Sequence, residues 1–169
     1  PLTIDATFTT GAAAGMAWSS TAAAAAFFVA SLDRDTGELN YACAGHDPPY
    51  LLRKSGDKAL TRKDLVPLNE VNDLRLGEDP SIVYKEAKLQ LQQGDQIVLY
   101  TDGVFDVLNV DGTAFGEKNF QKLVAQAHQP GAPMGDYIGV VKKTLQEHRG
   151  ATELPDDITF FSCRYEKAS

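Results

Sequence analysis

Three aspartates stand where two strand-like segments end or begin. Asp102 follows the apolar run 96–101, and Asp156 and Asp157 precede the apolar run 158–165. If these runs are neighbouring antiparallel strands, the end of one lies beside the start of the other, so the three acids meet at one sheet edge. Converging carboxylates repel unless a cation lies between them, and all-oxygen ligands favour Mg²⁺ or Mn²⁺. The spacing therefore predicts a hard-cation site, against the alternative that these acids only form a turn and cap a loop.

Other polar residues near these acids are candidates for supporting roles. Gly103 lets the backbone approach a ligand closely. His46, in the segment "AGHDPP", is a candidate general acid, with the alternative that it orders a turn between two strands. Neither Cys43 nor Cys163 has the basic surroundings that activate a nucleophilic thiol, and both are expected to be buried free thiols.

The elements that must position these residues follow a segregated order. A run of strands, then two helices and a final strand indicates an α+β fold with a mainly antiparallel sheet. The Ala-rich stretch 11–26 has no clear polar face, so residues 1–26 are expected to form a poorly defined N-terminal segment and residues 27–169 the domain. The patterns predict strands at 27–33, 38–45, 48–54, 81–91, 96–101 and 158–165, and helices near 117–128 and 135–148.

Composition narrows the class of protein. A chain of 169 residues with 43% hydrophobic residues suits one domain with a real core. The net charge of −7 and the lack of any Lys/Arg-rich stripe argue against a nucleic-acid partner. No apolar run reaches the roughly 18–20 residues of a membrane span, and no signal peptide is recognisable, so the expected location is the cytoplasm.

The motifs, taken in order, resemble a known family. The segments "FFVASLDRDTGELNYACAGHDPPYLL", "LQQGDQIVLYTDGVFDVLNVDGTAFG" and "LPDDITFF", within residues 27–165, resemble the SpoIIE/RsbU-type serine/threonine phosphatases of the metal-dependent, protein phosphatase 2C-like family. The resemblance implies an αββα sandwich of mainly antiparallel sheets flanked by helices. It also implies that Asp102 and Asp156 are catalytic residues and ligands in a two-metal Mg²⁺ or Mn²⁺ centre, with Gly103 and Asp157 as near neighbours.

The same resemblance implies a reaction and partners. Metal-bound hydroxide would hydrolyse phosphoserine or phosphothreonine in a phosphoprotein without a phosphoenzyme intermediate. The implied substrate is a protein of bacterial stress or sporulation signalling, such as an anti-sigma-factor antagonist. An upstream sensor or signalling domain is expected in the intact protein, and a homodimer is compatible with this reading.

Part of the family pattern is not found. The upstream G-D-x-x-D and downstream D-x-x-G-K-G motifs, which supply further metal ligands, have no match in the chain. Three explanations stay open: a fragment, in keeping with a start at Pro1 without Met; a divergent member with weakened metal binding; or a phosphatase-fold regulatory or binding domain without catalysis. A haloacid-dehalogenase-like phosphatase is a remote alternative, because Tyr100 stands where its nucleophilic aspartate would be and because that fold needs a parallel sheet.

Overall fold

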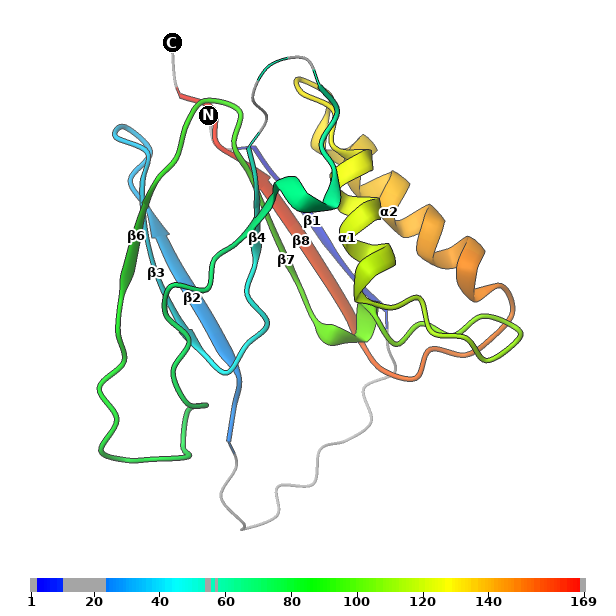
Figure 1. Ribbon diagram of the computed structural model, residues 1–169, viewed down its shortest axis with the longest axis horizontal. Coiled ribbons are helices and arrows are strands. Elements are labelled where there is room, and N and C mark those ends of the chain that lie inside the picture. Colours follow the sequence, from blue (N-terminus) through cyan, green and yellow to red (C-terminus); the bar gives the residue numbers. More distant parts are fainter. Residues whose placement is uncertain (1–2, 11–23, 54–55, 57, 168–169) are drawn as a thin grey trace.

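Two antiparallel sheets and a pair of helices form three layers (Figure 1). The computed structural model describes residues 3–10, 24–53, 56 and 58–167. The five-stranded sheet has the order β1 (Thr3–Thr10), β8 (Ile158–Arg164), β7 (Gln96–Tyr100), β4 (Tyr50–Leu52), β5 (Leu65–Pro67). The three-stranded sheet has the order β2 (Phe27–Leu32), β3 (Glu38–Ala44), β6 (Ala87–Gln90).

Helices α1 (Glu117–Ala127) and α2 (Met134–Arg149) lie on one side of the five-stranded sheet, and the three-stranded sheet lies on the other (Figure 1). Two short 3₁₀ helices, η1 (Arg62–Asp64) and η2 (Asp102–Val104), interrupt the connections. Every pair of named strands is antiparallel, which confirms the α+β class expected from the sequence. In the described part of the chain, no helix covers the outer face of the three-stranded sheet.

The hairpin of β2 and β3 is closed by a turn that Asp33 and Gly37 stabilise. The Asp33 carboxylate accepts hydrogen bonds from the backbone N–H groups of Asp35 and Thr36, at 2.9 and 3.0 Å. Gly37 has a φ of +79°, a conformation that residues with a Cβ rarely adopt. The predicted strands at 27–33 and 38–45 are confirmed as Phe27–Leu32 and Glu38–Ala44.

Strand β7 is buried on both faces because it lies in the middle layer. Val98 and Tyr100 pack toward the helices, whereas Ile97 packs toward the three-stranded sheet. Phe120 and Val124 of α1 are fully buried against the first of these faces. The apolar stripe of α2, formed by Tyr137, Val141 and Leu145, packs into the same cluster. Both predicted helices are therefore confirmed.

The expected lengths of two strands were wrong. The strand predicted at 48–54 is only Tyr50–Leu52, and the one predicted at 81–91 is only Ala87–Gln90. The segment before β6 alternates in sequence, but Val83 is 83% exposed, so alternation there does not mark a half-buried strand. Strands β1 and β5 were not predicted. Most of the Ala-rich stretch, residues 11–23, lies outside the described residues, and the division of the chain after residue 26 stays a prediction.

A buried ion pair supports the start of β7, at the end of the strand opposite Asp102. Asp95 is 2% exposed, and its carboxylate accepts hydrogen bonds from Arg53 Nε at 2.9 Å and from the backbone N–H of Gln92 at 2.8 Å. Cys43 and Cys163 are free thiols, as expected. Within the described residues, neither helix has the length and apolar character that crossing a membrane requires.

Candidate active site

The pairing of β7 with β8 brings the predicted acids to one sheet edge. Tyr100 is paired with Phe160, and the ladder continues one residue past the end of β7 through Thr101, whose N–H donates to the Thr159 carbonyl oxygen at 3.0 Å. The Thr101 hydroxyl accepts from the Thr159 N–H at 3.0 Å and donates to the Asp157 carbonyl oxygen at 3.3 Å. This one side chain ties the end of β7 to the segment that enters β8.

Gly103 lies close to the segment that carries Asp156 and Asp157. It is buried, and a Cβ built on it would overlap the Asp157 carbonyl oxygen and lie 3.7 Å from Asp156 Cβ. The glycine after Asp102 is therefore required by the close approach of the "DD" segment. Asp102 and Asp156 consequently lie on neighbouring segments at the same edge, where their side chains are exposed.

The Asp156 carboxylate is oriented locally. Its Oδ1 accepts a hydrogen bond from the backbone N–H of Asp157 at 2.7 Å. Asp102 begins η2, and its carbonyl oxygen accepts from the Phe105 N–H at 2.7 Å. Each acid thus sits on a short segment whose backbone is hydrogen-bonded, and both carboxylates face solvent.

Asp47 is a further carboxylate at this edge, and the sequence analysis did not single it out. Asp47 is exposed, but loss of part of its hydration to neighbouring atoms raises the pKa of its carboxyl, and the negative charge of Asp102 raises it further, whereas the neighbouring His46 lowers it. Asp47 therefore lies near enough to Asp102 for mutual repulsion to matter. Its place beside His46 in "AGHDPP" was the only sequence signal for it.

The turn that carries Asp47 is held at several points. The Tyr100 hydroxyl donates to the Pro48 carbonyl oxygen at 3.1 Å, and the Cys43 thiol donates to the His46 carbonyl oxygen at 3.2 Å. His46 Nδ1 donates to the Asp47 carbonyl oxygen at 2.7 Å, which fixes the ring beside the turn. This turn-ordering contact is the alternative role weighed for His46, and a role as general acid stays a prediction.

A cavity of about 390 Å³ adjoins this edge. Its walls come from the 45–50 turn, β4, η1, β7 and α1. The lining residues are Asp47, Pro48, Tyr50, Arg62, Leu65, Pro67, Asn69, Tyr100, Phe105, Glu117 and Gln121. A cavity of this size and polarity suits part of a peptide or a small polar ligand.

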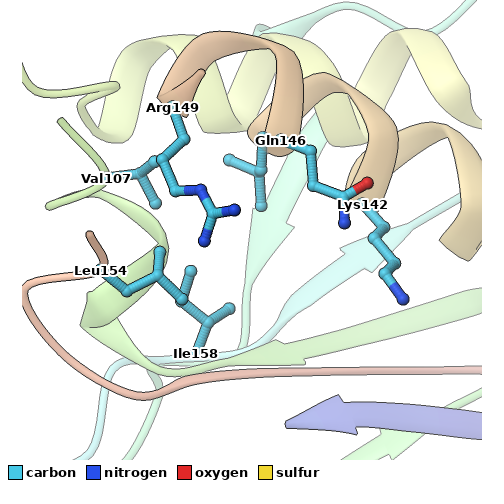
Figure 2. A pocket seen from close by; sticks show the side chains of 7 residues that line it. Val107, Lys142, Gln146, Arg149, Leu154 and Ile158 are labelled. Carbon is cyan, nitrogen blue, oxygen red and sulfur yellow. The ribbon is translucent and has the colours of Figure 1, made fainter. Parts of the chain in front are cut away.

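A second, smaller cavity lies beneath the C-terminal half of α2 and is unsuited to a substrate. It holds about 40 Å³, close to the space of one water molecule, and is lined mainly by apolar atoms. Figure 2 shows Arg149 pointing from α2 toward Leu154 and Ile158, which flank the "DD" segment. The packing of α2 near Leu154 and Ile158 supports the "DD" segment on the helix side of the sheet.

Asp102 and Asp156 supply some of the ligands that a hard cation requires. Asp102 and Asp156 supply two carboxylates at one exposed edge, and Mg²⁺ is commonly bound by one or two carboxylates with water in its remaining positions. Among the residues that the structure describes, no group of three or more His, Cys, Asp or Glu side chains is placed to hold a metal ion. Any ion at this edge would therefore keep several waters or take further ligands from elsewhere.

A known family matches most of the chain. The family described as stage II sporulation protein E (SpoIIE) matches residues 9–166. The fold defines the class as an α+β domain of the protein phosphatase 2C type. The chain belongs to the SpoIIE family.

A curated relative and two solved domains give the extent of the likeness. The phosphoserine phosphatase RsbU of Bacillus subtilis is 33% identical over 100 residues, which are 59% of this chain and 27% of the relative. The SiaA-PP2C domain of Pseudomonas aeruginosa has a TM-score of 0.60 at 22% identity, over 78% of this chain and 48% of that domain. The phosphatase domain of SpoIIE from Bacillus subtilis, presoaked with Mn, has a TM-score of 0.58 at 14% identity, over 86% of this chain and 58% of that domain.

These likenesses also show how much of the relatives the chain represents. It spans 20% and 27% of the length of the curated relatives that it matches. At 22% and 14% identity, the solved domains support the fold and carry no information on activity.

Proposed function

We propose that this chain is part of a metal-dependent protein serine/threonine phosphatase, with Asp102 and Asp156 as metal ligands. The observation that carries the proposal is the β7–β8 ladder, which places both acids at one edge in a chain of the SpoIIE family. When bound, Mg²⁺ or Mn²⁺ would supply a hydroxide at near-neutral pH and neutralise phosphate charge.

Residues of the chain itself would hold the two acids in position. Thr101 and Gly103 hold the two acid-bearing segments together, and the Asp157 N–H orients the Asp156 carboxylate. Neither cysteine is suited to act as a nucleophile, since burial raises the pKa of both thiols. This agrees with direct attack of water on the phosphorus of a phosphoserine or phosphothreonine.

The substrate class follows from the relative. RsbU is named a phosphoserine phosphatase, so we propose a phosphoprotein substrate of bacterial signalling, such as an anti-sigma-factor antagonist, in the cytoplasm. A regulatory or binding role without catalysis is the second candidate. It is favoured because, among the described residues, no group of three or more His, Cys, Asp or Glu side chains is placed to hold a metal ion.

A metal-binding experiment separates these two functions. Mn²⁺ binding is measured by calorimetry, and Mn²⁺-dependent phosphate release from a phosphoserine peptide is measured on the same protein. Asp102→Asn and Asp156→Asn should each weaken Mn²⁺ binding by at least about 10–100-fold, the loss seen even for outer partners of metal ligands. Asp111→Asn, on the exposed turn after η2, is the matched control.

The results decide as follows. Binding and turnover that are lost together in both variants support the phosphatase. Mn²⁺ binding without phosphate release supports the regulatory role. Full Mn²⁺-dependent turnover in Asp102→Asn would contradict the assignment of the ligands.

A further inference from the structure

The cavity beside Asp102 is left unexplained by the metal site. Tyr100 and Phe105, which flank Asp102 along the chain, both line it, so it opens directly next to the proposed reaction edge. Asp47 joins the two features, because it lines the cavity and its pKa is raised by the charge of Asp102. A group bound in this cavity would therefore lie beside whatever is bound at Asp102.

The cavity carries an uncompensated negative charge. Asp47 and Glu117 contribute two carboxylates, and Arg62 of η1 contributes one guanidinium. Among the described residues, no ion pair within 4.0 Å includes any of these three side chains. The lining therefore carries a net charge of −1, without counting Asp102. A negatively charged lining favours a cationic ligand.

The polar and aromatic groups of the cavity are already positioned. Glu117 Oε1 accepts hydrogen bonds from the Tyr50 hydroxyl at 3.3 Å and from Gln121 Nε2 at 2.8 Å. The rings of Tyr50 and Tyr100 stack at 5.4 Å with an interplanar angle of 18°. A fixed carboxylate beside aromatic rings is a combination that binds ammonium and guanidinium groups.

We propose that this cavity binds a basic side chain, Lys or Arg, that lies close in sequence to the phosphorylated residue of the substrate. Asp47 and Glu117 bind the cationic head, and the tyrosine rings contact the aliphatic stem. The inference rests on the proposed function, because it assumes that the phosphorylated residue is placed at the Asp102 edge. It adds a substrate preference set by residues outside the metal-binding acids.

The test is a binding measurement that does not depend on turnover. Fluorescein-labelled phosphoserine peptides, identical except for Lys or norleucine next to the phosphoserine, are titrated with the protein in EDTA and followed by fluorescence anisotropy. The wild-type protein should bind the Lys peptide about tenfold more tightly than the norleucine peptide, the ratio that one well-placed ionic contact gives. Glu117→Gln and Asp47→Asn should each reduce this ratio toward one, whereas Asp111→Asn should leave it unchanged.

Several outcomes would overturn the inference. The first is equal binding of both peptides by the wild-type protein. The second is a preference for the Lys peptide that remains in the Asp47→Asn/Glu117→Gln double variant. The third is tighter binding of a peptide with Glu at the same position, which would assign the cavity to Arg62. Loss of the preference on adding Mn²⁺ would show that the cation of this cavity is the metal, and would also overturn it.

Phosphate release measured in parallel separates the two proposals. A Lys preference without Mn²⁺-dependent hydrolysis contradicts the phosphatase and leaves the cavity assignment in place. Hydrolysis without a Lys preference contradicts the cavity assignment alone.

Discussion

Gly103 and Asp157 touch backbone to backbone, and a side chain at position 103 would occupy the place of the Asp157 carbonyl oxygen. This contact lies between the two segments that carry Asp102 and Asp156. The spacing of the two acids is therefore set by main-chain packing, and it depends on the absence of a Cβ at one position.

Replacement of that glycine should separate the segments. Gly103→Ala is expected to lower the free energy of unfolding by about 1–3 kcal/mol, the usual cost of forcing an extra methyl group into a packed site. Gly139→Ala is the control, because nothing lies within 4 Å of a Cβ at that position in α2. The control should raise the free energy of unfolding by up to about 1 kcal/mol through helix propensity. Urea unfolding measures both, and equal effects of the two substitutions would contradict the close contact.

The pKa of Asp47 predicts a stability change with a definite sign. Loss of part of its hydration and the charge of Asp102 raise this pKa above the usual 3.8, so the folded protein disfavours the ionised form. The penalty is present above the folded pKa and disappears as the pH falls below the unfolded value. Asp47→Asn should therefore raise the Tm at pH 7 and have little effect below pH 3.8.

Asp79 is a control for that experiment, because its pKa is shifted in the opposite direction to that of Asp47. The Ser81 hydroxyl and N–H both donate to its carboxylate, at 2.7 and 2.8 Å, and lower its pKa. The ionised Asp79 carboxylate stabilises the folded protein above the pKa that Asp79 has in the unfolded chain. This stabilisation is lost as the pH falls through the lower pKa of the folded protein. Asp79→Asn should therefore lower the Tm at pH 7. A lower Tm at pH 7 for Asp47→Asn as well would show that Asp47 is not repelled by its neighbours.

The ion pair between Arg53 and Asp95 should be costly to break. Asp95 is 2% exposed, so Arg53→Gln leaves a buried carboxylate without its cation and should cost about 3 kcal/mol. The surface pair of Lys88 and Glu38 is 65% and 46% exposed, and Lys88→Gln should cost less than about 1 kcal/mol. Chemical unfolding of the two variants checks the difference, and similar losses would contradict the role of burial.

The two cysteines should be unreactive in the folded protein. Burial raises the pKa of Cys163 to about 11 and raises that of Cys43, so little of the reactive thiolate exists at pH 8. Iodoacetamide should label both only after unfolding in urea, as followed by mass spectrometry. Rapid labelling of the native protein would place at least one thiol at an accessible, activated position.

The sequence was most informative for strand β7, whose residues are nearly all apolar. The run "QIVLYT" predicted a strand buried on both faces, and β7 has neighbours on both faces because it lies in the middle layer. The antiparallel pairing of β7 and β8, which was the condition for the acids to meet at one edge, is present. Burial on both faces leaves a continuous apolar run in the residues, whereas the choice of neighbouring strand does not.

Three other features were missed. Strand β1 reads "TIDATFTT", in which Ile4, Ala6 and Phe8 alternate with polar residues as in a half-buried strand, but it lies in the segment expected to be poorly defined. Strand β5 is only three residues long and ends at Pro67, so it has no readable period. Asp47 reaches Asp102 through tertiary contacts, such as that of Tyr100 with Pro48, which local patterns do not encode.

The pairing of β1 with β8 has a consequence for biosynthesis. Thr10 is paired with Ile158, so β1 leaves the ribosome long before β8, its neighbour in the sheet among the described strands. The same strand β8 brings Asp156 to Asp102. Contacts so distant in sequence form late, because closing a long loop costs entropy before any pairing stabilises it. A nascent chain therefore exposes the edge of β7 until β8 has been made, and translation that stops before β8 yields a chain without an assembled acidic edge.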